Sequence, residues 1–422
     1  MKTLLQTSTA LTLFAASTTA AFAADKAAVL TNYSNIAEAK YQDSLTTAKI
    51  LQSAVEALVA SPSAETLDAA RTAWIDARVP YQQSEVFRFG NAIVDDWEGK
   101  VNAWPLDEGL IDYVDAAYGG PSDENALAAL NVVANPTFEL SGKTIDASDI
   151  TPALLEGSLH EADGIEANVA TGYHAIEFLL WGQDLNGTDH GAGARAFTDY
   201  AAGADCTNGN CDRRGAYLKA ATDLLVSDLE WMAAQWATDG DARTALLGDE
   251  DAGISAMLTG MGSLSYGEQA GERMRLGLML NDPEEEHDCF SDNTHNSHYY
   301  DGKGVQNVYL GEYTRVNGDV VSGASLSDLV MAVNNDLDAE MRGKLSATMD
   351  ALGAMKAAAD GGFSYDQMLE QGNAEGEALI MGGINGLVDQ TQSIERVVTA
   401  LKLEGIEFEG SDSLDNPSAV FQ

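Results

Sequence analysis

Apolar residues recur at three- and four-residue steps along much of this chain, which is the spacing of one face of an α-helix. The longest run is formed by Leu30, Tyr33, Ala37, Tyr41, Leu45, Ala48, Leu51, Val55 and Leu58. A second run, between residues 377 and 401, alternates steps of four and three and is typical of the seam in a left-handed helical bundle. The pattern predicts an all-α fold built from long packed helices.

The same spacing predicts three further helices, over residues 213–236, 254–279 and 325–352. Ser61 followed by Pro62 has the pattern of an N-cap with proline at the first helical position, so we expect another helix to begin there. Pro80 should kink or break that helix. Residues 119–163 are interrupted by Gly, Pro and Asn, so we expect a connector with short helical pieces such as residues 124–133.

The segment from Thr171 to Asp184 combines titratable groups with an apolar helix. His174 and Glu177 stand three positions apart, so a helix places both side chains on one face. The residues that follow are apolar on every side, which indicates burial: Phe178, Leu179, Leu180 and Trp181. Burying an imidazole and a carboxylate is unfavourable unless they pair, hydrogen-bond or bind a metal. The segment therefore predicts either an internal ion pair or a metal site.

Residues 283–313 form a second stretch rich in chemistry. It contains three of the six histidines and several carboxylates: Glu286, His287, Asp288, Asp292, His295 and His298. Imidazole and carboxylate groups suit iron, zinc or manganese, so this stretch could complete a metal site. A polar loop whose Ser, Asn and Asp side chains form caps and turns explains the composition slightly better.

The chain has 422 residues, enough for one large or two ordinary domains, and we expect two. Its 66 acidic and 23 basic residues give a formal net charge of −43 at pH 7. Such a surface repels nucleic acid and anionic lipid, so nucleic acid is not an expected partner. Solubility in a salty habitat explains the charge better than a role in gathering cations.

The first 23 residues have the features of a secretory signal peptide. Lys2 is followed by an apolar centre and by the sequence Ala21, Phe22, Ala23, after which we expect cleavage. No later stretch approaches 18 unbroken apolar residues, so no transmembrane span is expected. We therefore expect an exported protein, either periplasmic or associated with the cell envelope.

The chain contains three cysteines. Cys206 and Cys211 flank a polar loop with the turn pair Asn208 and Gly209, and we expect a small disulfide-closed loop in an oxidising compartment. A metal site at these two cysteines is the alternative, although no second Cys or His pair lies nearby. Cys289 is either a buried thiol or a reactive one.

Several motifs together resemble the imelysin-like family. The string GYHAIEFLLWGQD is similar to the family's GxHxxE signature, with NAWPLD upstream and CFSDNTH downstream. The family includes iron-regulated envelope proteins and an insulin-cleaving membrane protease. The resemblance implies that His174 and Glu177 bind a metal ion, with iron favoured and zinc as the other choice.

The resemblance also implies further residues that face the site. Without it, Glu85 and Arg88 would be interpreted as a surface ion pair. The candidates are Glu85, Arg88 and Asp107 in the first half, Glu268 and Glu272 on the helix over 254–279, and Glu286, His287, Asp292 and His295 in the second dense stretch.

The string NCDRRGAYL resembles the start of the family's second helical unit. We therefore expect two helical bundles after the leader, residues 24–190 and 191–422, with a site at their interface. A weak similarity between EVFRF before NAWPL and EHDCF before QNVYL suggests a duplicated unit. Two bundles of this kind naturally form a pocket where they meet.

Two ligands are too few for a stable metal site, so at least one more must come from elsewhere in the fold.

The peptidase motif HExxH is absent. The motif HxxEH is absent too, because Phe178 stands where its second His would be. Three hypotheses follow, in order of preference: an iron-binding protein that serves iron uptake with an envelope partner, an imelysin-type metallopeptidase, and a helical interaction module whose His and Glu form a structural ion pair.

Overall fold

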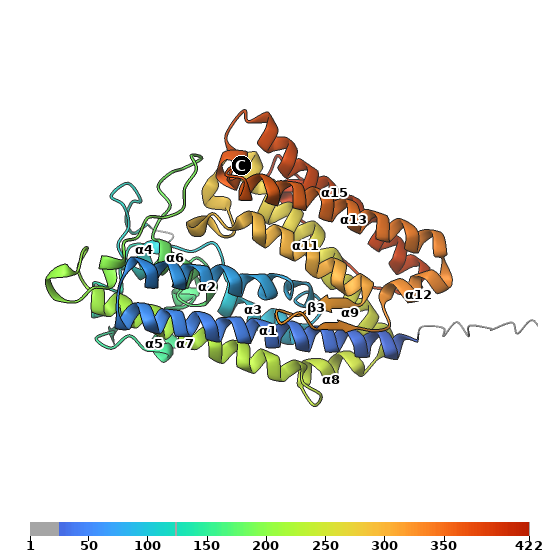
Figure 1. Cartoon of the computed structure of the whole chain (residues 1–422), viewed down its shortest axis with the longest axis horizontal. Coiled ribbons are helices and arrows are strands. Elements are labelled where there is room, and N and C mark those ends of the chain that lie inside the picture. The colour runs from blue at the N-terminus through green and yellow to red at the C-terminus, as the bar shows by residue number, and fades with distance from the viewer. Residues whose placement is uncertain (1–24, 123–124, 422) are drawn as a thin grey trace, which may run out of the picture.

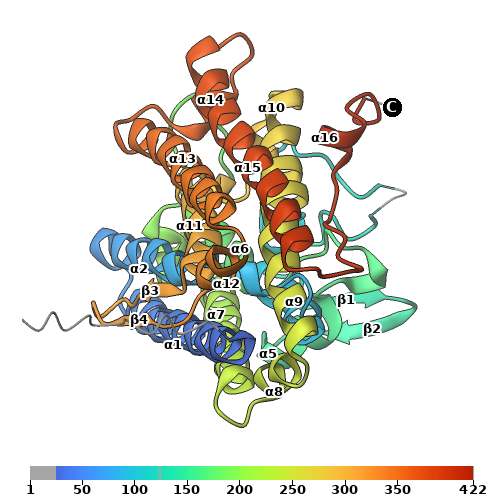
Figure 2. The same ribbon diagram turned by 90° about the vertical axis from the view of Figure 1, so that its right-hand side faces the viewer.

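The computed structural model describes residues 25–122 and 125–421, and the expected leader lies outside them. The prediction of an all-α fold is confirmed (Figure 1, Figure 2). The longer helices are α1 (Lys26–Ala60), α2 (Ala64–Gln82), α3 (Ala92–Asn102), α6 (Gly172–Trp181), α7 (Cys211–Trp236), α9 (Glu250–Ser263), α11 (Thr294–Leu310), α13 (Asn335–Asp360) and α15 (Ala374–Ala400). The shorter ones are α4 (Glu108–Ile111), α5 (Pro152–Leu154), α8 (Asp241–Leu247), α10 (Leu276–Leu280), α12 (Leu326–Val333), α14 (Tyr365–Leu369) and α16 (Asp412–Asp415).

The first hydrophobic core lies where α2 and α7 pack along α1 in the lower layer of Figure 1. α1 has 35 residues, which at 1.5 Å per residue gives a length of about 52 Å. Its predicted apolar face is buried, since Leu30, Ala37, Leu51 and Leu58 have no exposed surface. The helix predicted from residues 30–58 is thus confirmed.

The second hydrophobic core is formed by α13, α14, α15 and the π-helical segment η6 (Leu264–Arg275). Met274, Leu352, Ile380 and Leu387 are fully buried in it. α11 packs against both α2 and α13 and so lies between the two layers in Figure 1.

The start of α2 differs from the prediction. Ser63, rather than Ser61, is the N-cap: its hydroxyl accepts from the Thr66 N–H at 3.2 Å, and the Thr66 hydroxyl accepts from the Ser63 N–H at 2.9 Å. This reciprocal capping box satisfies two backbone donors, which favours Ser63 over Ser61. Pro80 does not break the helix, which continues to Gln82, because it lies in the last turn where few backbone bonds remain to be lost.

The helix predicted over residues 325–352 is two helices. Asn334 has an extended backbone and ends α12, and its side chain then caps α13 by accepting from the Leu337 N–H at 3.2 Å. The helix predicted over residues 254–279 consists of α9, the π-helical η6 and α10 in succession.

The composition of the second dense stretch favours a polar loop, but the stretch forms the helix α11 from residue 294 onward. Its glycines explain how a polar segment packs so closely. A Cβ on Gly302 would lie 2.6 Å from Leu352, and one on Gly304 would lie 2.6 Å from the Gln83 carbonyl oxygen. The helix is therefore held by tertiary packing that its polar sequence did not indicate.

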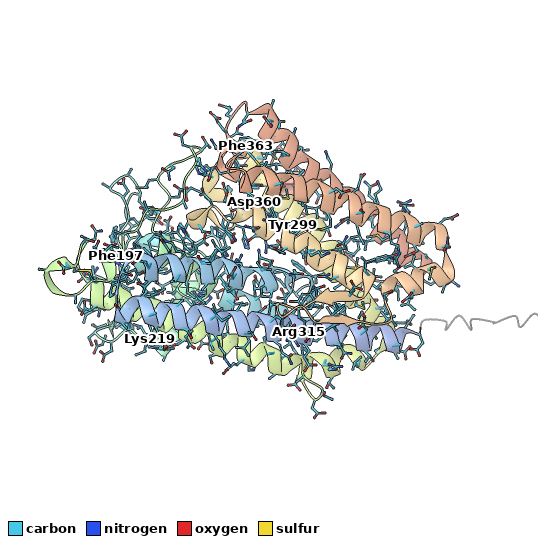
Figure 3. The ribbon with its side chains drawn as sticks, in the orientation of Figure 1. Phe197, Lys219, Tyr299, Arg315, Asp360 and Phe363 are labelled. Atoms are coloured by element: carbon cyan, nitrogen blue, oxygen red, sulfur yellow. A yellow bond between two sulfur atoms is a disulfide. The ribbon has the colours of Figure 1, made fainter. Side chains whose placement is uncertain are left out.

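Two antiparallel hairpins were not predicted. β1 (Thr137–Leu140) pairs with β2 (Lys143–Asp146), and β3 (Glu312–Thr314) pairs with β4 (Val320–Ser322). Arg315, labelled in Figure 3, follows β3 and donates to Asp43 of α1 at 2.7 and 3.0 Å, which fixes the second hairpin against the first core.

The prediction of a helical piece over residues 124–133 is wrong for residues 125–133, and residue 124 lies outside the described residues. Residues 125–133 form turns, and the N–H groups of Asn131, Val132 and Val133 donate to the carbonyls of α4. Bonds to a neighbouring segment replace the helix's own bonds here.

The expected division near residue 190 remains a prediction. α7 follows that position and packs along α1, whereas the second core draws on residues 270–387. Among the described residues, no helix is both long and apolar enough to cross a membrane.

Candidate metal centre

α6 carries the GxHxxE motif through the middle of the protein, and all ten of its residues are buried. Gly172 begins the helix with a φ of +80°, and a Cβ there would lie 2.4 Å from the Val101 carbonyl oxygen of α3. Only glycine permits both this backbone conformation and this close approach. Gly182 ends the helix with a φ of +74°.

His174 and Glu177 meet on one face of α6, as the spacing predicted. The Nδ1 atom of His174 lies 3.1 Å from Oε2 of Glu177. The other carboxylate oxygen, Oε1, accepts from both the backbone N–H and the hydroxyl of Ser291, at 3.0 and 2.7 Å. Ser291 thus fixes the direction in which Glu177 faces His174.

The loop before α11 adds a second imidazole and a carboxylate. Donor atoms of His174, His287 and Asp288 all lie within 4.8 Å of one another. Nδ1 of His174 is 4.0 Å from Oδ1 of Asp288, and Nδ1 of His287 is 3.8 Å from the same oxygen. The two imidazole rings are in edge contact, with centroids 4.8 Å apart. We call these three residues and Glu177 the His/Asp cluster.

Arg78 of α2 neutralises the aspartate of this cluster. Its guanidinium Nη2 donates to Oδ1 of Asp288 at 2.8 Å and lies 3.3 Å from Nδ1 of His287. Asn293 donates to the other oxygen of Asp288 at 2.7 Å, and the Ser297 hydroxyl also donates there. Asp288 is thus held by several donors, so its orientation is fixed before any ion arrives.

Burial and Arg78 keep both imidazoles neutral. Burial lowers the pKa of His174 to about 3, helped by Arg78, and burial together with Arg273 lowers the pKa of His287 well below its usual value. Burial alone would raise the pKa of Asp288, but Arg78, His174 and the hydrogen bonds from Ser297 and Asn293 together lower it below its usual value. Two neutral imidazoles and one ionised carboxylate are the forms that bind a metal.

Glu177 is different, because burial and the nearby charge of Asp288 raise its pKa well above the usual value. A cation would have to displace this proton before Glu177 could bind it.

The donor set fits a metal ion in chemistry and spacing. Bonds of about 2.0–2.2 Å from one ion require ligand atoms roughly 3–4 Å apart, and the separations of 3.1, 3.8 and 4.0 Å in the His/Asp cluster fall in this range. Nε2 of His174 is buried without a hydrogen-bond partner, so either ring nitrogen can supply a lone pair. Imidazole with carboxylate suits iron and zinc. The charge of Arg78 opposes a cation, which makes the carboxylates necessary.

Several predicted residues lie in a polar network beside the cluster rather than in it. Arg273 pairs with Glu85 at 2.6 Å and with Glu268 at 2.8 Å. Arg88 pairs with Asp95 at 2.9 Å and lies 3.7 Å from Glu268. Asn102 links this network to the cluster, because it donates to Glu85 at 3.1 Å and accepts from Arg78 at 2.6 Å.

The remaining candidates lie elsewhere. Glu272 is exposed on η6. Asp107 accepts from Tyr118 at 3.1 Å and from Asn125. His295 lies 3.4 Å from Asp360. Glu286 and Asp292 belong to a separate group of carboxylates, described below, while His287 is brought directly to His174.

Three residues that complete the arrangement carried no prediction: Arg78, Asn102 and Ser291. Asp288 was named only as part of the second dense stretch, not among the residues expected to face the site. Ser291 lies within the same stretch, next to the predicted Asp292. Arg78 carried no local signal, because its partner Asp288 is 210 positions away.

Cys206 and Cys211 form a disulfide that closes the loop before α7. Cys289 is buried and free, and burial raises the pKa of its thiol well above the usual value. A buried thiol of this kind is inert rather than reactive.

The fold and the cluster define a class of protein, a helical bundle with a buried imidazole and carboxylate site suited to a metal ion. The chain belongs to the imelysin family, whose family model matches residues 37–394. Over 57 residues, this chain is 39% identical to iron-regulated protein A of Synechococcus elongatus. The match covers 14% of this chain and 16% of that protein.

A solved structure shares the fold. The crystal structure of a protein assigned as an iron-regulated protein A precursor, from Parabacteroides distasonis, superposes with a TM-score of 0.64. The similarity covers 89% of this chain and 95% of that one, at 20% sequence identity.

Proposed function

We propose that this protein binds iron through His174 and Glu177, with His287 and Asp288 completing the site, and that it serves iron acquisition at the cell envelope. The observation that carries the proposal is the His/Asp cluster, in which donor atoms of two neutral imidazoles and a carboxylate lie within 4.8 Å of one another. The names of the two relatives, both iron-regulated proteins, favour iron over zinc.

Export is part of the same proposal. The first 23 residues have the pattern of a cleaved leader, and the Cys206–Cys211 disulfide suits an oxidising compartment. A protein that binds iron in the envelope would pass it to an uptake partner there, and the net charge of −43 favours the approach of cations.

Iron binding is tested with purified mature protein. Equilibrium dialysis against iron should leave one ion bound per chain, and His174→Ala should lose it because the change removes one of the two imidazole donors and the only one that lies beside Glu177. The matched control is His190→Ala, which removes an exposed imidazole outside the cluster and should retain binding. Equal iron binding in wild type and His174→Ala would contradict the proposal.

An imelysin-type metallopeptidase is the second candidate, and the raised pKa of Glu177 favours it, because a carboxyl that keeps its proton can act as a general acid. The burial of the cluster favours iron binding instead: His174 is 1% exposed and Asp288 is not exposed at all, so a polypeptide would need a large opening to reach them. Chelator-sensitive cleavage of an unfolded protein that disappears in Glu177→Ala would favour the peptidase.

A further inference from the structure

Four carboxylates form a second group, separate from the His/Asp cluster. Oxygens of Asp184, Asp292 and Asp366 all lie within 4.8 Å of one another. Asp184 lies in the loop after α6, Asp292 follows the short helix η8 (Cys289–Ser291), and Asp366 belongs to α14. The group therefore joins three segments that are far apart in the sequence.

Glu286 is the fourth carboxylate of the group. Its side chain has no exposed surface, and neither of its oxygens has a hydrogen-bond partner that meets normal geometry. Its carboxyl group lies against that of Asp366 and close to Asp292. An unpartnered buried carboxylate is unfavourable, and a second one beside it adds repulsion.

Two of the aspartates also have an oxygen without a hydrogen-bond partner. Oδ2 of Asp366 and Oδ1 of Asp292 are buried without a hydrogen-bond partner. Donors also reach the group: Asn186 donates to Oδ1 of Asp184 at 2.7 and 2.8 Å, and the Gly191 N–H donates to Oδ2 of Asp292 at 3.3 Å. The Thr294 and Ser364 side chains lie beside Glu286 and Asp366 and act on their pKa values. Asp184 and Asp292 are thus held by donors, while one oxygen each of Asp292 and Asp366 has none.

We propose that Asp184, Glu286, Asp292 and Asp366 form a second cation site, which takes a hard divalent ion of the calcium class. All four side chains supply oxygen only, which is the donor that Ca²⁺ prefers, whereas the His/Asp cluster supplies imidazole nitrogen. Three or more carboxylates around one ion are common in calcium sites, where backbone carbonyls and water complete the coordination.

The charge balance of the group agrees with this assignment. Burial and the neighbouring carboxylates raise the pKa of Asp292 to about 8, and burial raises the pKa of Asp184 to about 6. The strongest influences on these four carboxyls are burial, neighbouring carboxylates and hydrogen bonds, and none of them is a Lys or Arg. A bound cation would supply the positive charge that these influences lack. At neutral pH a divalent cation can take the place of the protons.

An ion in this position would tie the two hydrophobic cores together. Asp366 lies on α14, between Tyr365 and Leu369 of the second core, whereas Asp184 follows the motif helix of the first. A cation that binds only the folded chain stabilises it by mass action. The site is therefore a structural clamp, independent of whether iron binds the His/Asp cluster.

Calcium titration of metal-free mature protein tests the proposal. Calorimetry should show one Ca²⁺ per chain with a dissociation constant of about 10⁻⁴ to 10⁻³ M, the range of extracellular calcium modules. The melting temperature should rise with Ca²⁺, and both effects should be absent in the double variant Asp184→Asn, Asp366→Asn. Asn keeps the shape and removes the charge.

Two control variants separate this site from others. Asp360→Asn changes a carboxylate at the C-terminal end of α13, labelled in Figure 3, which pairs with Lys356 at 2.8 Å and should bind Ca²⁺ as wild type does. His174→Ala should also retain Ca²⁺, so a failure of the iron proposal does not affect this result.

Circular dichroism shows whether the double variant folds, and Asp292→Asn replaces it if it does not. The proposal would be overturned if wild-type protein showed no heat of Ca²⁺ binding in calorimetry and no change of melting temperature with Ca²⁺. So would an unchanged response in a folded double variant, or in Asp292→Asn when that variant is used.

Discussion

At the scale of single residues, Arg78 compensates a buried charge of the His/Asp cluster. It is 1% exposed, pairs with the unexposed Asp288 and hydrogen-bonds Asn102. Stacking also holds it, since its guanidinium lies 5.1 Å from the Tyr173 ring centroid. The network therefore depends on a residue whose importance is visible only in three dimensions.

Replacing Arg78 with Met should destabilise the protein strongly. The change leaves Asp288 buried without its cation, a loss of roughly 3–5 kcal/mol, measured as the free energy of unfolding in urea. Arg396→Met is the control: Arg396 is half exposed and pairs with Glu340, so it should change stability by less than about 1 kcal/mol. Similar small losses in both variants would show that the Asp288 charge is compensated by other means.

Asp228 on α7 should make stability depend on pH. Burial and Glu156 raise the pKa of Asp228 to about 6, although Lys100 acts in the opposite direction. The folded state therefore holds this proton more tightly than the unfolded chain, where the pKa is about 3.9. Its contribution to stability is complete below that value and is lost as the pH rises through about 6.

Urea titrations across this pH range compare wild type with Asp228→Asn. The variant cannot titrate, so its stability relative to wild type should increase as the pH rises. Asp239→Asn, an exposed carboxylate in the turn before α8, serves as the control and should follow wild type. A constant difference between Asp228→Asn and wild type would show that Asp228 has an ordinary pKa in the folded protein.

At the level of elements, the position of α11 depends on close contact with α2. Gly304 faces the Gln83 carbonyl oxygen, where a Cβ would lie at 2.6 Å. α11 begins just after the loop that carries His287 and Asp288, so this contact also sets where those side chains reach α6.

Gly304→Ala should therefore lower the free energy of unfolding by about 1–3 kcal/mol, as expected when a packed interface is overfilled. Gly343→Ala on α13 is the matched control, because a Cβ there meets nothing within 4 Å. That change should be neutral or stabilise the helix by up to about 1 kcal/mol. Thermal or urea unfolding of both variants makes the comparison, and a tolerated alanine at Gly304 would mean that α11 can move away from α2.

Elements with a clear apolar period could be predicted from the sequence, and those fixed by partners could not. α1 has nine apolar positions at helical spacing and was predicted within a few residues. α11 has no such period, since Asp301, Asn307 and its glycines are buried by packing against both cores. The turns at residues 125–133 likewise follow from backbone bonds to α4.

The same distinction applies to the candidate site. His174 and Glu177 could be placed on one face because they are three positions apart on a helix. Which residues approach that face depends on tertiary structure. His287 was expected to face the site and does, and Asp288 was named only as part of its stretch. Glu85 and Glu268 pair instead with Arg273. The family resemblance identified the segments that form the cluster, and the fold shows which residues of those segments lie in it.

At the scale of the whole molecule, the chain places two chemically different groups of ligands in the same region. The His/Asp cluster connects α6 with the loop before α11, and the four carboxylates connect that loop with α14. Ser291 and Asp292 are adjacent in sequence, and the first holds Glu177 while the second belongs to the carboxylate group. The stretch from Glu286 to Asp292 therefore serves both groups.

The central claim is that a metal ion sits against His174, His287 and Asp288, and anomalous scattering tests it most directly. Crystals of the iron-loaded protein, measured on both sides of the iron absorption edge, should give an anomalous peak beside the His174 imidazole and the Asp288 carboxylate. His174→Ala crystals treated in the same way should lack it. A map with no peak there, or with iron only among Asp184, Asp292 and Asp366, would contradict the account.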